Sequence, residues 1–259
     1  MFVESTPGGQ PSASSATNLS SFISPFFQQI VTVEHHPYAL EALFRLRGCN
    51  ILPAKLFGQW ERTGYICHVD LAMIRCVRLI LSAQATRIRV TVNVSPQTIR
   101  LMQEALIAEL CALAAVTRRT IVEITEHMEP ETAMVVEFAR RLDEHGIYLA
   151  LDDCRMSHVF TSRSFVEAVR PKFLKIDGGV VTQCVLGGDR HMLCDIVSLA
   201  SSVGAVAIAE WVDSEEKRDF MASAGVQYLQ GHLFGVARAW TTGSMSTDKT
   251  EVLAHAASA

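Results

Sequence analysis

Four ionisable side chains lie at the ends of two short apolar runs near the middle of the chain. The run at 147–151 is followed directly by Asp152 and Asp153, and the run at 173–176 contains Lys175 and is followed by Asp177. Charged groups at the edge of an apolar core are costly to bury unless they are paired or bind a metal ion. The pattern predicts a metal site, an ion-pair network, or both, at the ends of two strands.

Further polar residues lie at or near the ends of other strand-like runs: Glu41, Asn93, Glu123, Glu210 and Gln230. In a barrel of parallel strands the C-terminal ends meet on one face, where active sites lie. One run shows the alternation expected of such a strand: Val90 and Val92 share a face that can pack on helices, whereas Asn93 points the other way. We expect the polar side chains to converge.

These residue types favour a particular chemistry. Several carboxylates packed together repel one another, so cations are needed among them. Carboxylate and amide oxygens are hard ligands that suit Mg²⁺ or Mn²⁺ better than Zn²⁺. Two such ions can activate a water molecule and stabilise the leaving oxygen of a phosphodiester. A single acidic residue at a strand end is more often a helix cap or a surface charge, and Lys175 could simply neutralise its acidic neighbours. The recurrence of polar residues at the ends of several strands is what favours a metal site.

Short apolar runs alternate with amphipathic segments along most of the chain. Strands are predicted at 26–33, 39–46, 88–94, 120–125, 147–151, 173–176, 206–209 and 228–234, and helices at 68–84, 95–114, 131–144, 189–203 and 214–224. Regular alternation of this kind favours an α/β barrel over an open sheet. Because no helix separates the first two strands, we expect a hairpin there.

Composition limits the class of protein. The chain has 259 residues, 49% hydrophobic content and a net charge of -4, which argues against a general binder of nucleic acid or membrane surfaces. No apolar run reaches the roughly 18–20 residues that span a bilayer. Seven cysteines without a C-x-x-C pair indicate reduced thiols in a cytoplasmic protein. We expect a disordered N-terminal tail at 1–20, one barrel domain at 21–240 and a flexible C-terminal tail at 241–259.

Taken together, the motifs resemble those of the EAL-domain family of cyclic di-GMP phosphodiesterases over roughly 26–239. The matching residues are Glu41-Ala42-Leu43 with Arg45, Asn93-Val94-Ser95-Pro96, Glu123-Ile124-Thr125-Glu126, Asp152-Asp153, Lys175-Ile176-Asp177, Ala209-Glu210 and Gln230-Gly231. The resemblance implies a modified TIM (β/α)₈ barrel whose first strand runs antiparallel to the others. It also implies hydrolysis of cyclic di-GMP, a bacterial second messenger, to linear 5′-pGpG.

The resemblance assigns roles to individual residues. Two metal ions, Mg²⁺ or Mn²⁺, would be held by Glu41, Asn93, Glu123, Asp152 and Asp153. The catalytic residues would be Lys175, Glu210 and Glu41. The substrate contacts would be Arg45, Gln28 and Asp177. The supporting residues would be Glu126, which braces the loop after the paired aspartates, and Gln230. The histidines, His127 and His232 among them, lack the spacing of metal ligands and are interpreted as surface or core residues.

Three segments depart from the family pattern. After the paired aspartates the family usually continues Phe-Gly-Thr-Gly-Tyr-Ser-Ser, whereas residues 154–160 here read Cys-Arg-Met-Ser-His-Val-Phe. Losing both glycines makes positive φ angles costly, by about 1 kcal/mol each. The usual Glu-Gly-Val-Glu is Glu210-Trp211-Val212-Asp213, and the usual Gln-Pro is Gln28-Gln29. In the family the loop couples the metal site to a homodimer interface at the barrel edge, so a homodimer is implied.

Two functions remain open from the sequence. The first is a metal-dependent phosphodiesterase acting on cyclic di-GMP, favoured because none of the metal ligands is missing. The alternative is a catalytically weak or inactive member that binds cyclic di-GMP or a protein partner and acts as a regulator, which the altered loop favours.

Overall fold

The structure, a computed structural model, describes residues 19–48, 54–84, 87–155 and 158–240. The predicted N-terminal tail lies outside these ranges except for Leu19 and Ser20, and the predicted C-terminal tail lies wholly outside them. Both tails therefore stay predictions.

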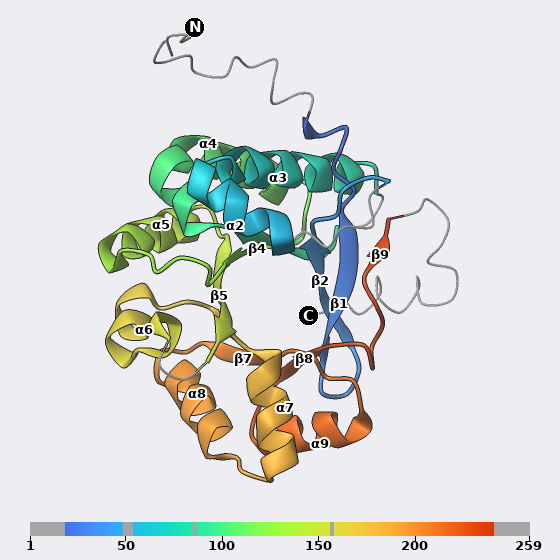
Figure 1. Ribbon diagram of the computed structural model, residues 1–259, viewed down its shortest axis with the longest axis vertical. Helices are drawn as coiled ribbons and strands as arrows, with labels where there is room; N and C mark the ends of the chain where they lie inside the picture. Colours follow the sequence, from blue (N-terminus) through green and yellow to red (C-terminus); the bar gives the residue numbers. More distant parts are fainter. Residues whose placement is uncertain (1–18, 49–53, 85–86, 156–157, 241–259) are drawn as a thin grey trace, which may run out of the picture.

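Eight strands form a closed barrel with helices around it (Figure 1). The strands are β1 (Phe26–Thr32), β2 (Pro37–Leu43), β3 (Arg89–Val94), β4 (Arg119–Ile124), β5 (Tyr148–Cys154), β6 (Phe173–Ile176), β7 (Val206–Ala209) and β8 (Tyr228–Gln230). β2 to β8 are parallel neighbours in chain order, and β1 closes the ring by pairing antiparallel with both β2 and β8. The predicted barrel, hairpin and antiparallel first strand are confirmed. A two-residue strand, β9 (Arg238–Ala239), also pairs with β1.

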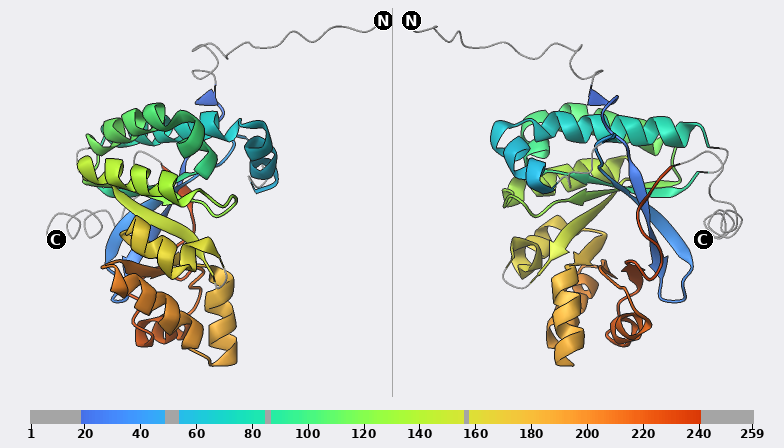
Figure 2. Two further views of the ribbon diagram at one scale, coloured as in Figure 1. Left: turned by 90° about the vertical axis from the view of Figure 1, so that its left-hand side faces the viewer. Right: turned by 45° about the vertical axis from the view of Figure 1, so that its right-hand side comes forward.

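Helices cover the outside of the barrel (Figure 2). They are α2 (Ala54–Thr63), α3 (Ile66–Ser82), α4 (Pro96–Ala114), α5 (Thr132–Glu144), α6 (Arg163–Val169), α7 (Gly178–Gly187), α8 (His191–Ser202) and α9 (Glu215–Ser223), with a 3₁₀ turn, η1, at Val159–Thr161. The predicted helices do not include α2, which contains the helix-weakening Gly58, α6, which has only seven residues, or α7, which begins and ends with glycine. None of the described helices is long and apolar enough to cross a bilayer.

Two apolar clusters lie on the two sides of the barrel wall. The larger one fills the space between strands and helices and contains Val90, Val92 and Val94, as the alternation predicts. The smaller one fills the barrel interior and consists of Ile30, Ala39, Ile121, Ala150, Phe173 and Ile208, packed against Tyr38, Tyr148, Val206 and Tyr228. This inner layer makes the barrel a packed core rather than a pore.

The inner layer fixes where the polar side chains must lie. Because side chains alternate along a strand, a residue two positions after an inner-layer residue points into the barrel one step higher. Six inner residues are followed in this way by Glu41, Glu123, Asp152, Lys175, Glu210 and Gln230. The polar residues therefore form the next layer, at the end of the barrel where the parallel strands finish.

A buried carboxylate joins α3 to the start of α4. Asp70 accepts hydrogen bonds from the backbone N–H of Ser95 (2.9 Å) and from the hydroxyl of Thr98 (2.5 Å). Ser95 itself caps α4, since its side chain accepts a hydrogen bond from the N–H of Gln97. Burial raises the pKa of Asp70 to about 7. The contact fixes the segment that follows Asn93.

Replacing Thr98 by valine is expected to lower the free energy of unfolding by about 1–3 kcal/mol, because a buried carboxylate loses a hydrogen bond without any change of shape. Denaturant unfolding monitored by circular dichroism measures this. Thr132→Val, at an exposed position at the start of α5, is the matched control and should change stability little. If Thr98→Val and Thr132→Val had the same free energy of unfolding, the hydrogen bond from Thr98 to Asp70 would contribute nothing to stability.

Candidate functional site

Lys175 lies at the centre of the polar layer. Its side chain is 1% exposed, and its Nζ lies 2.7 Å from Glu210 Oε1, 2.8 Å from Glu123 Oε2 and 2.9 Å from Asp152 Oδ1. Glu41 Oε2 is 3.6 Å away. One ammonium group thus faces carboxylates from four different strands or strand ends, as the recurrence of the sequence pattern predicts.

Glu41 is oriented by two amides. Its Oε1 accepts a hydrogen bond from Asn93 Nδ2 (2.8 Å), and its Oε2 accepts one from Gln230 Nε2 (2.5 Å). Gln230 Nε2 also lies 3.4 Å from Gln28 Oε1, and Gln28 Nε2 donates to the carbonyl of Gly235 at 3.1 Å. The contacts connect β1, β2, β3 and β8, so the closing strand of the barrel helps to hold the site.

A bulge in β5 brings the paired aspartates to the same side. Leu151 pairs with Leu174 and Cys154 with Ile176, so β5 contains one extra residue between these pairs. Asp153 has a φ of 46°, in the left-handed region. In a regular strand Asp152 and Asp153 would point to opposite faces, but the bulge places an oxygen of each, and one of Glu210, within 4.8 Å of one another. The prediction that β5 ends at 151 missed this extension.

Burial and crowding shift the pKa values of these groups. Burial alone would lower the pKa of Lys175, but the four surrounding carboxylates raise it well above its usual value. Burial raises the pKa of Glu123 to about 8 and that of Asp153, which also lies beside Asp152 and Glu126, to about 7. At Glu41 burial acts in the same direction, but Lys175 and the two amides outweigh it and lower the pKa. The layer holds more negative charge than one lysine compensates.

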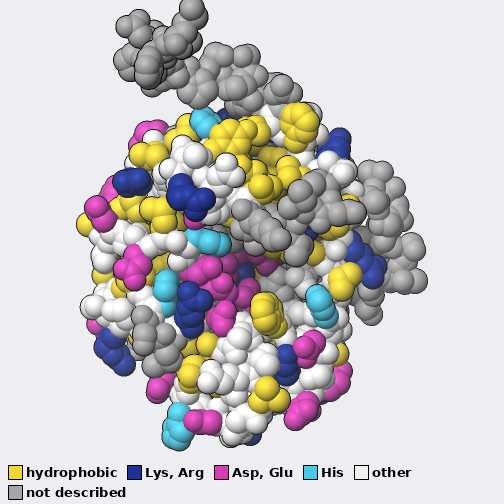
Figure 3. Space-filling model, viewed as in Figure 1, with side chains coloured by type: hydrophobic (Ala, Val, Ile, Leu, Met, Phe, Trp, Pro, Cys, Tyr) yellow, Lys and Arg dark blue, Asp and Glu magenta, His cyan; other side chains and the backbone are white. Residues whose placement is uncertain are grey.

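The donor atoms fit a hard divalent cation. Among the described residues, Asn93 Oδ1 and Glu123 Oε1 are buried without a hydrogen-bond partner, which is costly in a finished core. Both oxygens lie in the layer that contains the three clustered carboxylates. Oxygen donors of this kind are the ligands preferred by Mg²⁺, Mn²⁺ and Ca²⁺. The acidic groups gather at the centre of one face of the molecule (Figure 3).

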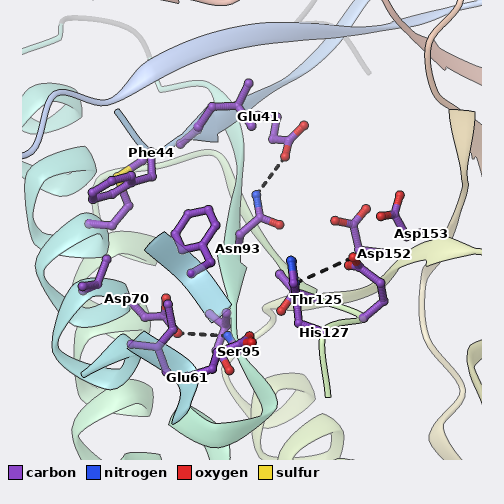
Figure 4. Close-up of a pocket in the computed structure, with 18 of the residues that line it drawn as sticks. Glu41, Phe44, Glu61, Asp70, Asn93, Ser95, Thr125, His127, Asp152 and Asp153 are labelled. Carbon is purple, nitrogen blue, oxygen red and sulfur yellow. Dashed lines mark hydrogen bonds and ion pairs between the residues drawn. The ribbon is translucent and has the colours of Figure 1, made fainter. Parts of the chain in front are cut away.

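Two cavities meet at this layer. The larger, of about 410 Å³, is lined by Gln28, Lys175, Glu210, Trp211, Asp213, Gln230 and His232. The smaller, of about 230 Å³, is lined by Arg45, Asn93, Glu126, His127, Asp153 and side chains from α2 and α3. Glu41 and Asp152 line both. Figure 4 shows Glu41, Asn93, Asp152 and Asp153 around the smaller one.

The remaining predicted residues occupy different places. Arg45 borders the smaller cavity, where its guanidinium donates to the carbonyl of Phe44 and lies 5.7 Å from the ring centre of Phe26. Gln28 borders the larger cavity. Asp177 does not line either cavity; it caps α7 by accepting a hydrogen bond from the N–H of Val180 at 3.0 Å. Its predicted contact with substrate stays a prediction.

Three residues with polar or aromatic side chains line the larger cavity although the sequence did not assign them to the site. The sequence indicates only a surface or core position for His232, and Trp211 and Asp213 are departures from the family pattern without a predicted role. Their position in the chain could have identified them, because Trp211 and Asp213 follow the end of β7 and His232 follows the end of β8. In a parallel barrel the loops after these strands border the site.

The altered loop after β5 is partly described. Cys154 is buried, with its Sγ 3.5 Å from the carbonyl oxygen of Leu151, and the 3₁₀ turn follows at Val159. Glu126 contributes to the raised pKa of Asp153 by charge repulsion and by a hydrogen bond, and its Oε1 lies 3.7 Å from His127 Nδ1. Met156 and Ser157, where the second of the missing glycines would be, lie outside the described residues. Glu126 thus interacts with Asp153, the residue just before the loop. Its role in bracing residues 154–160 stays a prediction.

Comparison with known proteins identifies the family. The EAL domain family matches residues 15–237. Cyclic di-GMP phosphodiesterase PdeF of Escherichia coli (strain K12) is 26% identical over 207 residues, which are 75% of this chain and 27% of PdeF. PdeL, a cyclic di-GMP phosphodiesterase of the same strain, is 30% identical over 121 residues, 45% of this chain and 32% of PdeL. The chain therefore spans about a third or less of the length of these curated relatives.

Solved structures share the fold. The PaMucR phosphodiesterase in complex with c-di-GMP superposes with a TM-score of 0.70 at 23% identity, covering 84% of this chain and 97% of that chain. BlrP1 of Klebsiella pneumoniae, in a manganese and cy-diGMP complex, gives 0.68 at 19% identity, covering 84% of this chain and 56% of that chain. Since the family match extends over most of the chain and the barrel agrees with these structures, the protein belongs to the EAL domain family.

Proposed function

We propose that the protein is a metal-dependent phosphodiesterase that hydrolyses cyclic di-GMP to linear 5′-pGpG. The observation that carries the proposal is the layer of oxygen donors around Lys175, in which buried oxygens of Asn93 and Glu123 have no hydrogen-bond partner among the described residues. The names of the relatives PdeF and PdeL support the same substrate.

We assign the cations, two of Mg²⁺ or Mn²⁺, to Glu41, Asn93, Glu123, Asp152 and Asp153, with Glu210 beside them. A divalent cation held there would supply Lewis-acid chemistry, withdrawing charge from a phosphate oxygen and making water more acidic. The cluster of Asp152, Asp153 and Glu210 supports a divalent ion at this place, and the manganese in the BlrP1 complex supports the kind of ion.

The protein's own side chains have separate tasks in this reaction. Lys175 holds the carboxylates of Glu123, Asp152 and Glu210 together through contacts of 2.7–2.9 Å. Glu210 borders the larger cavity and is placed to accept a proton from the attacking water. The water oxygen bonds to phosphorus and the bond from phosphorus to the 3′ oxygen breaks. That oxygen takes up a proton from solvent water, and Glu210 releases to solvent the proton it accepted. The two cavities on either side of Glu41 and Asp152 would hold the two halves of the dinucleotide.

The direct test is to incubate purified protein with cyclic di-GMP and Mg²⁺ or Mn²⁺ and to follow 5′-pGpG by chromatography. We expect turnover with either ion and none with excess EDTA. Binding of cyclic di-GMP without turnover would instead support the regulator that the altered loop suggested. The complete set of ligands favours the enzyme.

Adding Mn²⁺ to metal-free protein is expected to raise its free energy of unfolding, by about 2.7 kcal/mol at one hundred times the dissociation constant, because the ion binds only the folded layer. Thermal melts at increasing Mn²⁺ measure this. Asp153→Asn should weaken the effect, whereas Asp143→Asn, exposed on α5, should not. Identical curves for Asp153→Asn and the parent would exclude Asp153 as a ligand.

We propose that the protein acts in the cytoplasm, because its proposed substrate is a second messenger made inside the cell. We also propose a homodimer through the barrel edge beside residues 154–160, which light scattering of the purified protein would test; a monomer at all concentrations would contradict it.

A further inference from the structure

Trp211 presents a large aromatic side chain at the edge of the larger cavity. It follows Glu210 directly, borders the same cavity as Lys175 and His232, and is 66% exposed. Its φ of 53° lies in the left-handed region, which is costly for a side chain of this size. An outlier of this kind beside a functional layer is a reason to look for a role in binding.

One face of the indole is covered by a glycine. A Cβ atom added at Gly178 would lie 2.1 Å from Trp211 Cγ, 2.2 Å from Cδ2 and 2.6 Å from Cδ1. The ring therefore lies flat against the Cα of Gly178, at the start of α7, where only glycine leaves room. Because the residue is 66% exposed with that face covered, the exposed area belongs to the opposite face and the ring edge.

The loop that holds Trp211 is anchored on both sides. Lys217 Nζ donates to the carbonyl of Trp211 at 3.1 Å and contacts Asp213 Oδ2 at 2.9 Å and Thr182 Oγ1 at 3.3 Å. The N–H of the next residue, Val212, donates to the carbonyl of Gln230 at 3.0 Å. These contacts hold the loop against α7, α9 and β8. The ring therefore loses little conformational entropy when a ligand binds.

We propose that the exposed face of Trp211 stacks on a guanine base of the dinucleotide and so favours purine over pyrimidine bases. This inference rests on the proposed function and adds a specificity residue to it. A flat, anchored aromatic face beside the acidic layer is the arrangement on which a nucleobase stacks, and such stacking contributes about 1–3 kcal/mol per base in single-stranded nucleic acid complexes. That range corresponds to roughly 5- to 150-fold in affinity.

The test compares the parent with Trp211→Gly and Trp211→Phe. Glycine removes the ring and accepts the left-handed backbone, so this variant should fold at least as well as the parent. We expect KM for cyclic di-GMP to rise at least fivefold in Trp211→Gly while kcat falls much less, and phenylalanine to restore most of the affinity. The preference of the parent for cyclic di-GMP over cyclic di-UMP in competition should shrink in Trp211→Gly. Leu186→Ala, which removes an exposed apolar side chain on α7, is the matched control.

The outcomes separate the two hypotheses. If the parent hydrolyses cyclic di-GMP and Trp211→Gly has the same KM and the same base preference, the stacking role is overturned and the proposed function stands. If the parent neither binds nor hydrolyses cyclic di-GMP, both are overturned. A Trp211→Phe variant as weak as Trp211→Gly would also contradict stacking, because phenylalanine retains an aromatic face.

Discussion

Replacing Lys175 by methionine is expected to lower the rate of cyclic di-GMP hydrolysis by at least about 100-fold. It should also lower the free energy of unfolding by about 3–5 kcal/mol. Methionine nearly fills the space, so the effect comes from charge. Without the ammonium, Glu123, Asp152 and Glu210 would lie within the same buried layer with no cation between them. Product chromatography and denaturant unfolding in EDTA measure the two effects.

Mn²⁺ should restore part of the stability of Lys175→Met but not its turnover, which separates charge neutralisation from catalysis. Lys172→Met is the matched control, because Lys172 is exposed just before the same strand, with its Nζ 5.9 Å from the ring centre of Tyr148. The control should hydrolyse the substrate like the parent. Parent-like turnover by Lys175→Met would refute the assignment of Lys175.

Replacing Glu41 by glutamine is expected to lower turnover by more than about 100-fold, because the layer loses a negatively charged oxygen donor that a divalent cation needs. The change also misplaces hydrogen-bond donors. Glu41 now accepts from Asn93 Nδ2 and Gln230 Nε2, and a glutamine amide can accept with only one of its two terminal atoms. A moderate loss of stability, about 1–3 kcal/mol, should follow.

Turnover at saturating Mn²⁺ measures the effect at Glu41, and calorimetric titration shows whether the ion is still bound. Glu34→Gln, exposed in the turn between β1 and β2, is the matched control and should retain full turnover. Our assignment would be wrong if Glu41→Gln kept both its affinity for Mn²⁺ and its activity.

The sequence predicted the strands well because most of them are short apolar runs. The position of Glu123, Asp152 and Lys175 at or near the ends of such runs predicted that they converge, and the structure brings these three together. Helix α2 was missed because Gly58 weakens its pattern and its role depends on packing against α3. Strand β8 was predicted to reach 234 but ends at Gln230, because the chain turns there: the N–H of Phe234 donates to the carbonyl of Gly231 at 3.1 Å.

Other features could not be predicted from the chain alone. The bulge in β5 could not be predicted: Asp153 has a positive φ, which aspartate adopts more readily than most residues, but aspartate is also common at ordinary strand ends. The stack of Trp211 on Gly178 joins residues 33 positions apart and depends on the relative position of β7 and α7. Local patterns predict which face a residue occupies, but not which distant side chain it meets.

The seam made by β1 has a consequence for how the protein emerges from the ribosome. β1 cannot pair with β8 until β8 has been synthesised. The hydrogen bond to Glu41 cannot form until Gln230 has been synthesised, 189 residues later. Until then the nascent chain carries an open strand edge that invites wrong partners. Chaperone protection is thus most needed during the final part of translation, and a prematurely terminated product would lack a closed ring.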